Sequence, residues 1–325
     1  MSTGNAPSIN TVVSGTRQSL NGRRQLTRSL RPARQLRRIF REQACNAVQA
    51  VRSASLGTEN VHEARKYIKR ARATLRLLRS AIGEGSFARE DRTLKAAADR
   101  LGAMRDSEVA VQTMDELIQR CRSARTKSSM HSRRVQLQRI HVKSQAARGT
   151  SVPRAVALLE RAATRSRDWT VSDSWYSPID AVERLYRKAR RYYRQAIESA
   201  DDKTLHSLRK RTQYLRNALD VLALQPSNSM QRLKRRLSRL AELSGEDHDL
   251  AMLQATLLAH RLGHSQAGLD AILSLVEQRR TGLQSRVLKH AARLFRHKPG
   301  HFSRKLDRHW RRSKEASRAR PTSSN

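Results

Sequence analysis

The sequence contains an internal repeat, and this repeat favours a fold built from two copies of one unit. Residues 61–66 (Val-His-Glu-Ala-Arg-Lys) resemble residues 205–210 (Leu-His-Ser-Leu-Arg-Lys) at an offset of 144 positions. Residues 101–106 align with residues 244–249 at an offset of 143. One match alone would be a coincidence in a chain rich in helix-forming and basic residues. Two matches in the same order, at nearly the same separation, indicate a duplication.

The repeated unit is predicted to be helical. The 325 residues include only 13 Gly and 7 Pro, and strand-like runs of Val, Ile, Thr and Tyr are missing. Aromatic residues make up 4%, so Leu, Ala and Val must fill the core, as they do in helical bundles. The apolar period predicts helices at residues 36–53, 61–82, 87–104, 107–121, 128–147, 152–167, 178–199, 204–224, 229–244, 248–262, 265–281 and 283–297.

Polar, basic segments flank the helical part of the chain. Residues 1–35 lack a sustained apolar period, and residues 299–325 are similar, with Pro299-Gly300 expected to end a helix. We therefore predict a flexible tail at each end and one domain between them, at residues 36–298. The domain is divided into a first half at about 36–121, a helical spacer at about 122–167 and a second half at about 178–298.

The balance of charge predicts a polyanionic partner. Lys and Arg number 67 and Asp and Glu only 28, so the formal net charge is +39. A chain this basic repels itself until a polyanion neutralises it, and the planar guanidinium of Arg matches phosphate oxygens. No apolar run is long enough to cross a membrane, and the two cysteines form no disulfide framework, so we expect a cytoplasmic protein. The acid-free N-terminus is also typical of transit peptides, which is the weaker interpretation.

Each repeated helix is predicted to carry a row of cations beside its apolar face. At about 100° per residue, Val61, Ala64 and Ile68 share one arc of the first helix, and Leu205 and Leu208 the matching arc of the second. Like charges one turn apart repel, so the neighbouring row is unfavourable without an opposing line of negative charge. That row is His62, Arg65, Lys69, Arg72 and Arg76, flanked by Lys66, on the first helix, and His206, Arg209, Gln213, Arg216 and Asp220, flanked by Lys210, on the second.

A chain of phosphates would satisfy both rows, because it supplies a line of charge without bases or sugars. The alternative is a solvated basic surface, which is the usual role of Lys and Arg rows on helices. The register of His62 with His206, and of Arg65 with Arg209, favours a shared anion-facing role. The histidines would gain charge on binding phosphate, so affinity should increase as pH falls.

These residues give the sequence its resemblance to the CHAD family, the conserved histidine α-helical domain, over roughly residues 36–298. Four motifs carry the resemblance in order: His-x-x-Arg with further basic residues at 62–72, Leu-Gly-x-x-Arg-Asp at 101–106, Leu-His-x-x-Arg-Lys at 205–210 and a Gly-x-x-x-Asp turn at 245–249. The resemblance implies an all-α fold of two four-helix bundles related by a pseudo-twofold axis. It also implies a basic central cavity that binds inorganic polyphosphate, and association with polyphosphate granules.

The candidate binding residues follow from the resemblance, position by position. It implies polyphosphate contacts from His62, Arg65, Lys69, Arg70, Arg72, His206, Arg209, Lys210 and Arg216. Lys66 and Arg76 join them from the helical row, and Arg92 and Arg235, which align at an offset of 143, are expected to line the same cavity. Gln213 departs from the family pattern, in which a basic residue is usual, and this weakens the second half of the site.

Two other functions compete with polyphosphate binding. The total charge also suits a nucleic-acid-binding protein, and the basic tails are expected to bind nucleic acid non-specifically at low salt. Against it, no zinc finger or basic zipper appears, and base-stacking aromatic residues are scarce. An enzyme acting on polyphosphate would use His62 or His206 as a nucleophile, but no acidic residue is placed to orient either. We therefore expect no catalytic residue, no metal site and no cofactor.

Two features of the sequence allow more than one interpretation. Asp106 and Asp249 each follow a predicted glycine turn, where a helix N-cap is favoured over a role in orienting arginines. The spacer contains no acidic residue from Leu117 to Leu159, and it is either a solvated arm or an additional polyanion contact. Its arginines, such as Arg133, are expected to matter less for binding than those of the repeated helices.

Overall fold

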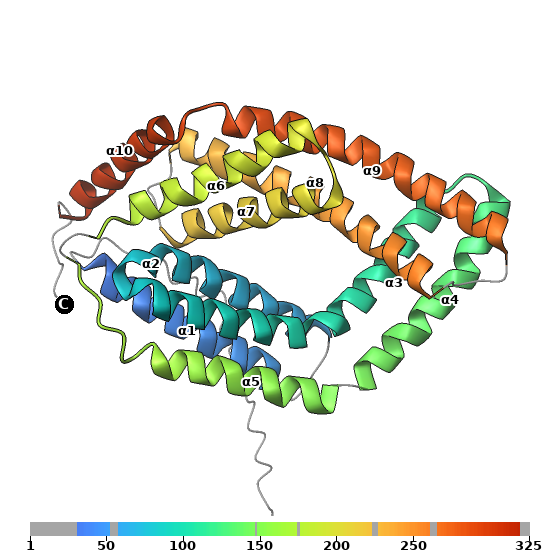
Figure 1. Cartoon of the computed structure of the whole chain (residues 1–325), viewed down its shortest axis with the longest axis horizontal. Helices are drawn as coiled ribbons and strands as arrows, with labels where there is room; N and C mark the ends of the chain where they lie inside the picture. The colour runs from blue at the N-terminus through green and yellow to red at the C-terminus, as the bar shows by residue number, and fades with distance from the viewer. Residues whose placement is uncertain are drawn as a thin grey trace, which may run out of the picture.

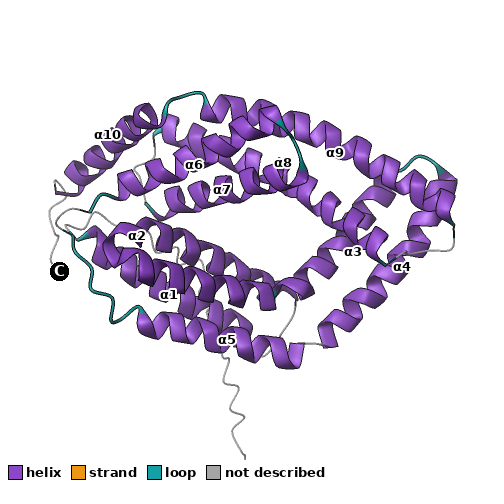
Figure 2. Cartoon of the chain, in the orientation of Figure 1, coloured by secondary structure: helices purple, strands orange, loops and turns teal. Residues whose placement is uncertain are grey.

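The structure is a computed structural model that describes residues 31–52, 58–146, 148–173, 176–222, 227–260 and 265–318. These ranges contain ten helices and no strand (Figures 1 and 2), in agreement with the predicted all-α class. No helix among them is long and apolar enough to span a membrane. The helices are α1 (Pro32–Arg52), α2 (Thr58–Arg100), α3 (Gly102–Arg120), α4 (Ala124–Ala146), α5 (Arg148–Arg165), α6 (Pro178–Glu198), α7 (Asp202–Val221), α8 (Asn228–Ala259), α9 (Gln266–Phe295) and α10 (Pro299–Arg318).

The first group of helices consists of α1, α2 and α5, which contact one another (Figure 1). The backbone of α2 reverses at Gly83, whose φ of 78° and ψ of 161° favour glycine. The second segment then runs back along the first, so that Arg65 reaches Ala98 and Arg72 reaches Asp91. The break predicted after residue 82 is therefore present, and it creates two antiparallel segments.

Helix α5 belongs to the first core, and the prediction of a spacer at 122–167 needs correction. Ala155, Leu159 and Ala162 of α5 are fully buried, and α5 contacts both α1 and α2. A bidentate ion pair fixes this packing, because Arg165 donates to the fully buried Glu90 carboxylate at 2.8 and 2.7 Å. A buried carboxylate requires such a partner.

The second group contains α6, α7, α8 and α9, with α10 packed on α6 (Figure 1). The ring of Phe302 stacks on that of Tyr186 with 4.0 Å between centroids, and Leu306 and Trp310 are buried behind it. The predicted C-terminal tail at 299–325 is therefore wrong over residues 299–318, and Pro299 begins a helix instead of ending one. Of the predicted N-terminal tail, residues 1–30 lie outside the described residues, and α1 already begins at Pro32.

Helices α3 and α4 contact each other and connect the two groups, since α3 also contacts α8 and α4 contacts α9. Arg133 of α4 is 2% exposed and donates to the Ser265 carbonyl at the start of α9, at 2.7 Å. Gly268 permits this close approach, because a Cβ there would overlap the Ser129 hydroxyl oxygen. Arg133 is thus a packing residue, which neither interpretation of the spacer had suggested.

Two predicted helix breaks are absent. Residues 229–244 and 248–262 were expected as separate helices, as were 265–281 and 283–297, but α8 and α9 continue through Gly245 and Gly282. A helical glycine costs only about 1 kcal/mol, which packing along a long helix overcomes.

Gly245→Ala is expected to raise the free energy of unfolding by about 0.5–1 kcal/mol, because alanine loses less conformational freedom in a helix. A Cβ at this position would meet nothing within 4 Å. Urea unfolding measures the change. A loss of stability would instead support the turn that the sequence suggested at residues 245–249.

Candidate anion-binding site

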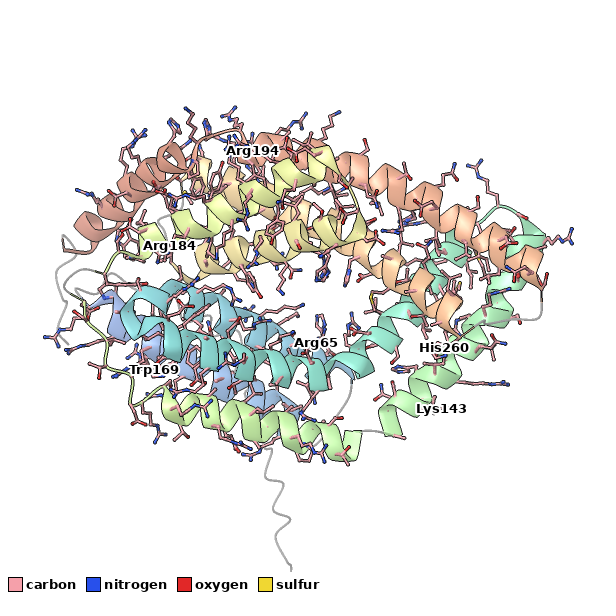
Figure 3. The ribbon with its side chains drawn as sticks, in the orientation of Figure 1. Arg65, Lys143, Trp169, Arg184, Arg194 and His260 are labelled. Atoms are coloured by element: carbon pink, nitrogen blue, oxygen red, sulfur yellow. The ribbon has the colours of Figure 1, made fainter. Side chains whose placement is uncertain are left out.

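The predicted cation rows lie on two helices that contact each other, α2 and α7. The apolar residues Val61, Ala64 and Ile68 of α2, and Leu205 and Leu208 of α7, are buried as predicted. This burial fixes the rotation of each helix and so the direction of the neighbouring row. Figure 3 shows Arg65 on the side of the first group that faces the second group.

Four predicted cations from the two helices form a cluster, which we call the central cluster: Arg65, Lys69, Arg209 and Arg216. Lys69 is exposed, so a ligand can reach it. Partial burial of its ammonium, together with the positive charges of Arg65, Arg209 and Arg216, lowers the pKa of Lys69 to about 8. Cations from α2 and α7 thus lie within electrostatic reach of one another.

Arg65 and Arg209 differ in how they are held within the central cluster. Arg65 donates from Nη1 to the Ala98 carbonyl at 3.3 Å and forms an ion pair with Asp106 at 3.6 Å. Gly102 makes room for it, because a Cβ there would lie 3.2 Å from the same nitrogen. Burial lowers the pKa of Arg209, while Asp249 opposes that shift. The buried Nε of Arg209 has no hydrogen-bond partner among the described residues.

Arg72 and Arg76 belong to the predicted row, but their guanidinium groups are already engaged. Arg72 Nε donates to Asp91 at 2.9 Å, and Arg76 Nη2 contacts both Asp91 oxygens at 3.0 and 3.1 Å. The Arg76 guanidinium carbon also lies 3.7 Å from the ring centroid of Tyr214 on α7. These contacts join the two segments of α2 to each other and to α7. A supporting role therefore accompanies any contact of these two arginines with an anion.

The predicted histidines lie close to the cations. Burial, followed by the charges of Arg105, Lys66 and Lys69, lowers the pKa of His62. The ring of His206 lies 4.9 Å from that of His248, centroid to centroid. Burial, with Arg209, His206 and Lys69 as further causes, lowers the pKa of His248 to about 3, and burial also lowers the pKa of His206. All three imidazoles are therefore neutral at pH 7 in the empty protein.

The remaining predicted residues lie outside the central cluster. Lys66 forms an ion pair with Glu63, and the Arg70 guanidinium lies 5.6 Å from the Tyr67 ring centroid. Lys210 lies within electrostatic reach of Arg72 and Arg76. Arg92 on α2 and Arg235 on α8 are exposed, and no contact among the described residues joins either to the cluster.

The prediction that Asp106 and Asp249 are N-caps is wrong. Both lie inside helices, α3 and α8, and both carboxylates are near arginines of the cluster. Burial raises the pKa of Asp249, against the opposing pull of Arg209, Arg105 and Lys69. Asp106 and Asp249 instead fit a role in orienting arginines, which was the less favoured interpretation of the sequence.

Sequence reasoning missed two residues of this site, Arg105 and His248. The positive charge of Arg105 lowers the pKa of both His62 and Arg65, and the ring of His248 lies beside that of His206. The signal was available, because the two positions are 143 residues apart and match each other in the second pair of repeats. The alignment paired the two positions, but neither residue was counted among the binding residues.

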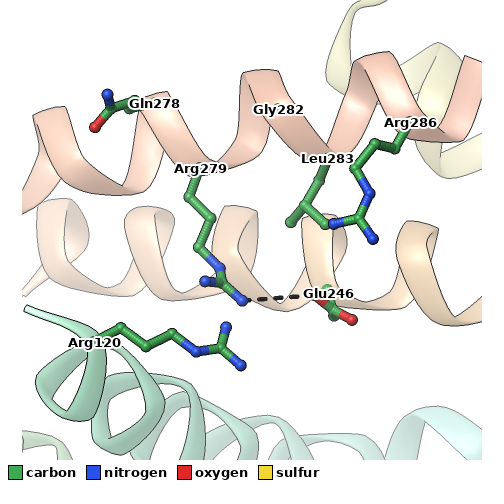
Figure 4. Close-up of a pocket in the computed structure, with 7 residues that line it drawn as sticks. All are labelled: Arg120, Glu246, Gln278, Arg279, Gly282, Leu283 and Arg286. Carbon is green, nitrogen blue, oxygen red and sulfur yellow. Dashed lines mark ion pairs between the residues drawn. The ribbon is translucent and has the colours of Figure 1, made fainter.

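A cavity of about 420 Å³ lies between the end of α3 and the middle of α9 (Figure 4), and none of the predicted binding residues lines it. Arg120 extends toward it from α3, and Arg279 and Arg286 from α9. Arg279 is paired with Glu246 of α8 at 3.6 Å. This cavity is basic but open, and of the residues that line it only Glu246 belongs to one of the sequence motifs.

The fold and site together define an all-helical protein with cations gathered between two groups of helices. Residues 34–258 match the CHAD domain, and the chain belongs to the CHAD family. Its structure is similar to that of the CHAD domain from the plant Ricinus communis, at 15% identity and a TM-score of 0.55, over 84% of this chain and 92% of that one. It is also similar to PptA from Streptomyces chartreusis, at 14% identity and a TM-score of 0.57, over 82% and 99%. A comparison with curated proteins finds no match.

Proposed function

We propose that the chain binds inorganic polyphosphate without catalysis, through the central cluster and the histidines of α2 and α7. The observation that carries the proposal is the meeting of Lys69 with Arg65, Arg209 and Arg216 from two helices. Four cations held this close repel one another, and their mutual repulsion is relieved when an anion lies among them. Arginine and lysine are the side chains that bind phosphate oxygens most effectively.

The shape of the site favours a bare phosphate chain over a nucleic acid. Binding of single strands usually depends on aromatic rings on which bases stack. The ring of Tyr214 on α7, which faces α2, is 5% exposed and lies against Arg76. A base would find no open ring there, whereas a phosphate chain needs none.

A catalytic role is disfavoured by the state of the nearest carboxylates. Phosphoryl transfer generally depends on carboxylates that hold a metal ion. Asp91 is bound by Arg72 and Arg76, and Asp106 is paired with Arg65. Within the described residues, no group of three or more His, Cys, Asp or Glu could hold a metal. These carboxylates instead orient the arginines.

We also infer that the two groups of helices are copies of one unit with the basic site between them. The order of elements supports this inference, because α1, the first segment of α2, and α3 correspond in sequence to α6, α7 and the second part of α8. At the same offset, α4 falls on α9, and α5 falls on the end of α9 and the start of α10, which places the predicted spacer within the first copy. The free thiols Cys45 and Cys121 suit a reducing cytoplasm. Within the cytoplasm, the location that we propose is the polyphosphate granule.

The experiment that tests the proposal is a competition at physiological salt between polyphosphate of defined lengths and DNA. Long polyphosphate should displace DNA far more effectively than DNA displaces polyphosphate, and raising the salt should weaken both. Phosphate release from polyphosphate, with and without magnesium, tests the absence of catalysis. Preferential binding of DNA, or steady release of phosphate, would contradict the proposal.

Polyphosphate affinity is expected to fall as pH rises from about 7 to about 9, because only the protonated Lys69 attracts phosphate. The pKa of Lys69 is about 8 in the empty protein, and a bound anion raises it. Binding is therefore strongest below that pKa and weakens as pH rises through it. Lys69→Arg retains the charge without the titration, so its affinity should vary much less over the same range. Isothermal titration calorimetry at several pH values measures the affinity of the unmodified protein and of the variant. Identical pH profiles would exclude Lys69 as the cause of the pH dependence.

A further inference from the structure

A second cavity, of about 160 Å³, lies where the start of α8, the end of α9 and α10 meet. None of its lining residues belongs to the central cluster, and α10 lies beyond the residues that match the CHAD domain. Two of the helices that form it, α9 and α10, run along the side of the second group that is turned away from α2 (Figure 1). The cavity is therefore separate from the proposed polyphosphate site.

The floor of this cavity is apolar. It is formed by Met230, Leu294, Phe302 and Leu306, which are each exposed by 9% or less. An apolar cavity of about 150 Å³ is large enough to hold one benzene ring. The space therefore suits a single bulky apolar group, such as one Phe or Leu side chain.

The rim of the cavity is cationic. It is lined by Arg232 and Arg236 from α8, Arg293 from α9, Arg296 just after the end of α9, and Lys305 from α10, and no acidic residue lines it. No ion pair with any described residue neutralises these five side chains. An occupant must therefore combine an apolar anchor with several negative charges arranged around it.

We propose that this cavity binds an acidic protein segment that inserts one bulky apolar side chain between the cations. Bare polyphosphate would leave the apolar floor empty, and a small aromatic acid carries too few charges for cations on three helices. A second copy of this chain would be repelled by its charge of +39, and residues 1–30 and 319–325 contain no acidic residue. None of the exposed large apolar residues of the described part, such as Val135 and Ile197, lines the cavity, which disfavours a lipid surface.

The proposal is tested with two labelled peptides, Asp-Glu-Asp-Phe-Glu-Asp-Glu and the same sequence with Ala at its centre. Burial of the Phe side chain should make the first peptide bind about tenfold more tightly, or better, in fluorescence anisotropy. Equal affinities would mean that charge alone attracts the peptides, and they would overturn the proposal. Failure of the Phe peptide to displace the protein from vesicles of anionic lipid would favour a lipid surface and would overturn it as well.

Two sets of variants locate the binding. Leu233→Trp, at a half-buried position of the lining, should fill the cavity and abolish the preference for Phe while leaving polyphosphate affinity unchanged. The double variant Arg236→Ser with Arg293→Ser should lose at least threefold more affinity for both peptides than the double variant Arg125→Ser with Arg139→Ser. The second pair removes the same charge from exposed positions on α4. A preference that survives Leu233→Trp, or equal losses in the two pairs, would overturn the proposal. If Leu233→Trp loses its helical circular dichroism, the two pairs of arginine variants decide whether the proposal holds.

Discussion

Lys69→Glu combined with Arg216→Glu is expected to weaken polyphosphate binding by about 100-fold or more. Each residue presents a positive charge to the central cluster, and each hydrogen bond to a charged group contributes about 1.5–3 kcal/mol. Neither side chain makes an ion pair with a described residue, so the loss reports on binding more than on folding. The replacements also place negative charges directly beside the ligand. Fluorescence anisotropy with labelled polyphosphate at physiological salt measures the affinity.

The matched control is Arg125→Glu combined with Arg139→Glu on α4. Both residues are exposed, and the pair changes the net charge by the same amount. These replacements alter only the overall electrostatic field of the protein, so the expected loss of polyphosphate affinity is less than about tenfold. Arg133 is unsuitable as a control, because it is buried and bonded to Ser265. Equal losses in the two double variants would mean that polyphosphate binds diffusely over the basic surface.

The sequence predicted the buried faces of α2 and α7, and so the direction in which the residues of the candidate site lie, because helical periodicity determines both. Burial of Ala64 and Ile68 on α2, and of Leu208 on α7, sets the direction of the cation rows, and a 3.6-residue period reveals those faces. The partners of individual arginines could not be predicted in this way. Asp91 meets Arg72 and Arg76 only because the chain reverses at Gly83, and the geometry of that reversal is a tertiary property.

The errors in the fold have two physical causes. Glycines were interpreted as breaks, yet Gly245 and Gly282 remain helical because the packing of long helices outweighs a small local cost. Helix α10 was missed because its polar residues dominate the composition. Phe302, Leu306 and Trp310 repeat every four residues, which is the signal of a buried helical face.

Arg280→Leu is expected to lower the free energy of unfolding by about 3–5 kcal/mol, the usual cost of removing one partner from a buried ion pair. Arg280 is 5% exposed and joins three helices. It donates to Asp247 at 3.3 Å and to Gln254 at 3.0 Å on α8, and it pairs with Asp202 at the start of α7. Burial already raises the pKa of Asp247, and loss of Arg280 would raise it further.

Three measurements separate this effect from a simple loss of packing. Urea unfolding of Arg279→Leu, whose ion pair with Glu246 is partly exposed, should show a loss below about 1 kcal/mol. Arg280→Leu combined with Asp247→Leu should recover much of the stability, because no buried charge is left without a partner.

The pH dependence of stability is the third measurement. A carboxyl group whose pKa is raised in the folded protein is tolerated at low pH, where it is neutral, and its favourable effect is lost as the pH rises through that pKa. The deficit of Arg280→Leu relative to the unmodified protein should therefore grow from about pH 4 to pH 7, and a deficit independent of pH would show that Asp247 is not the group left unpaired.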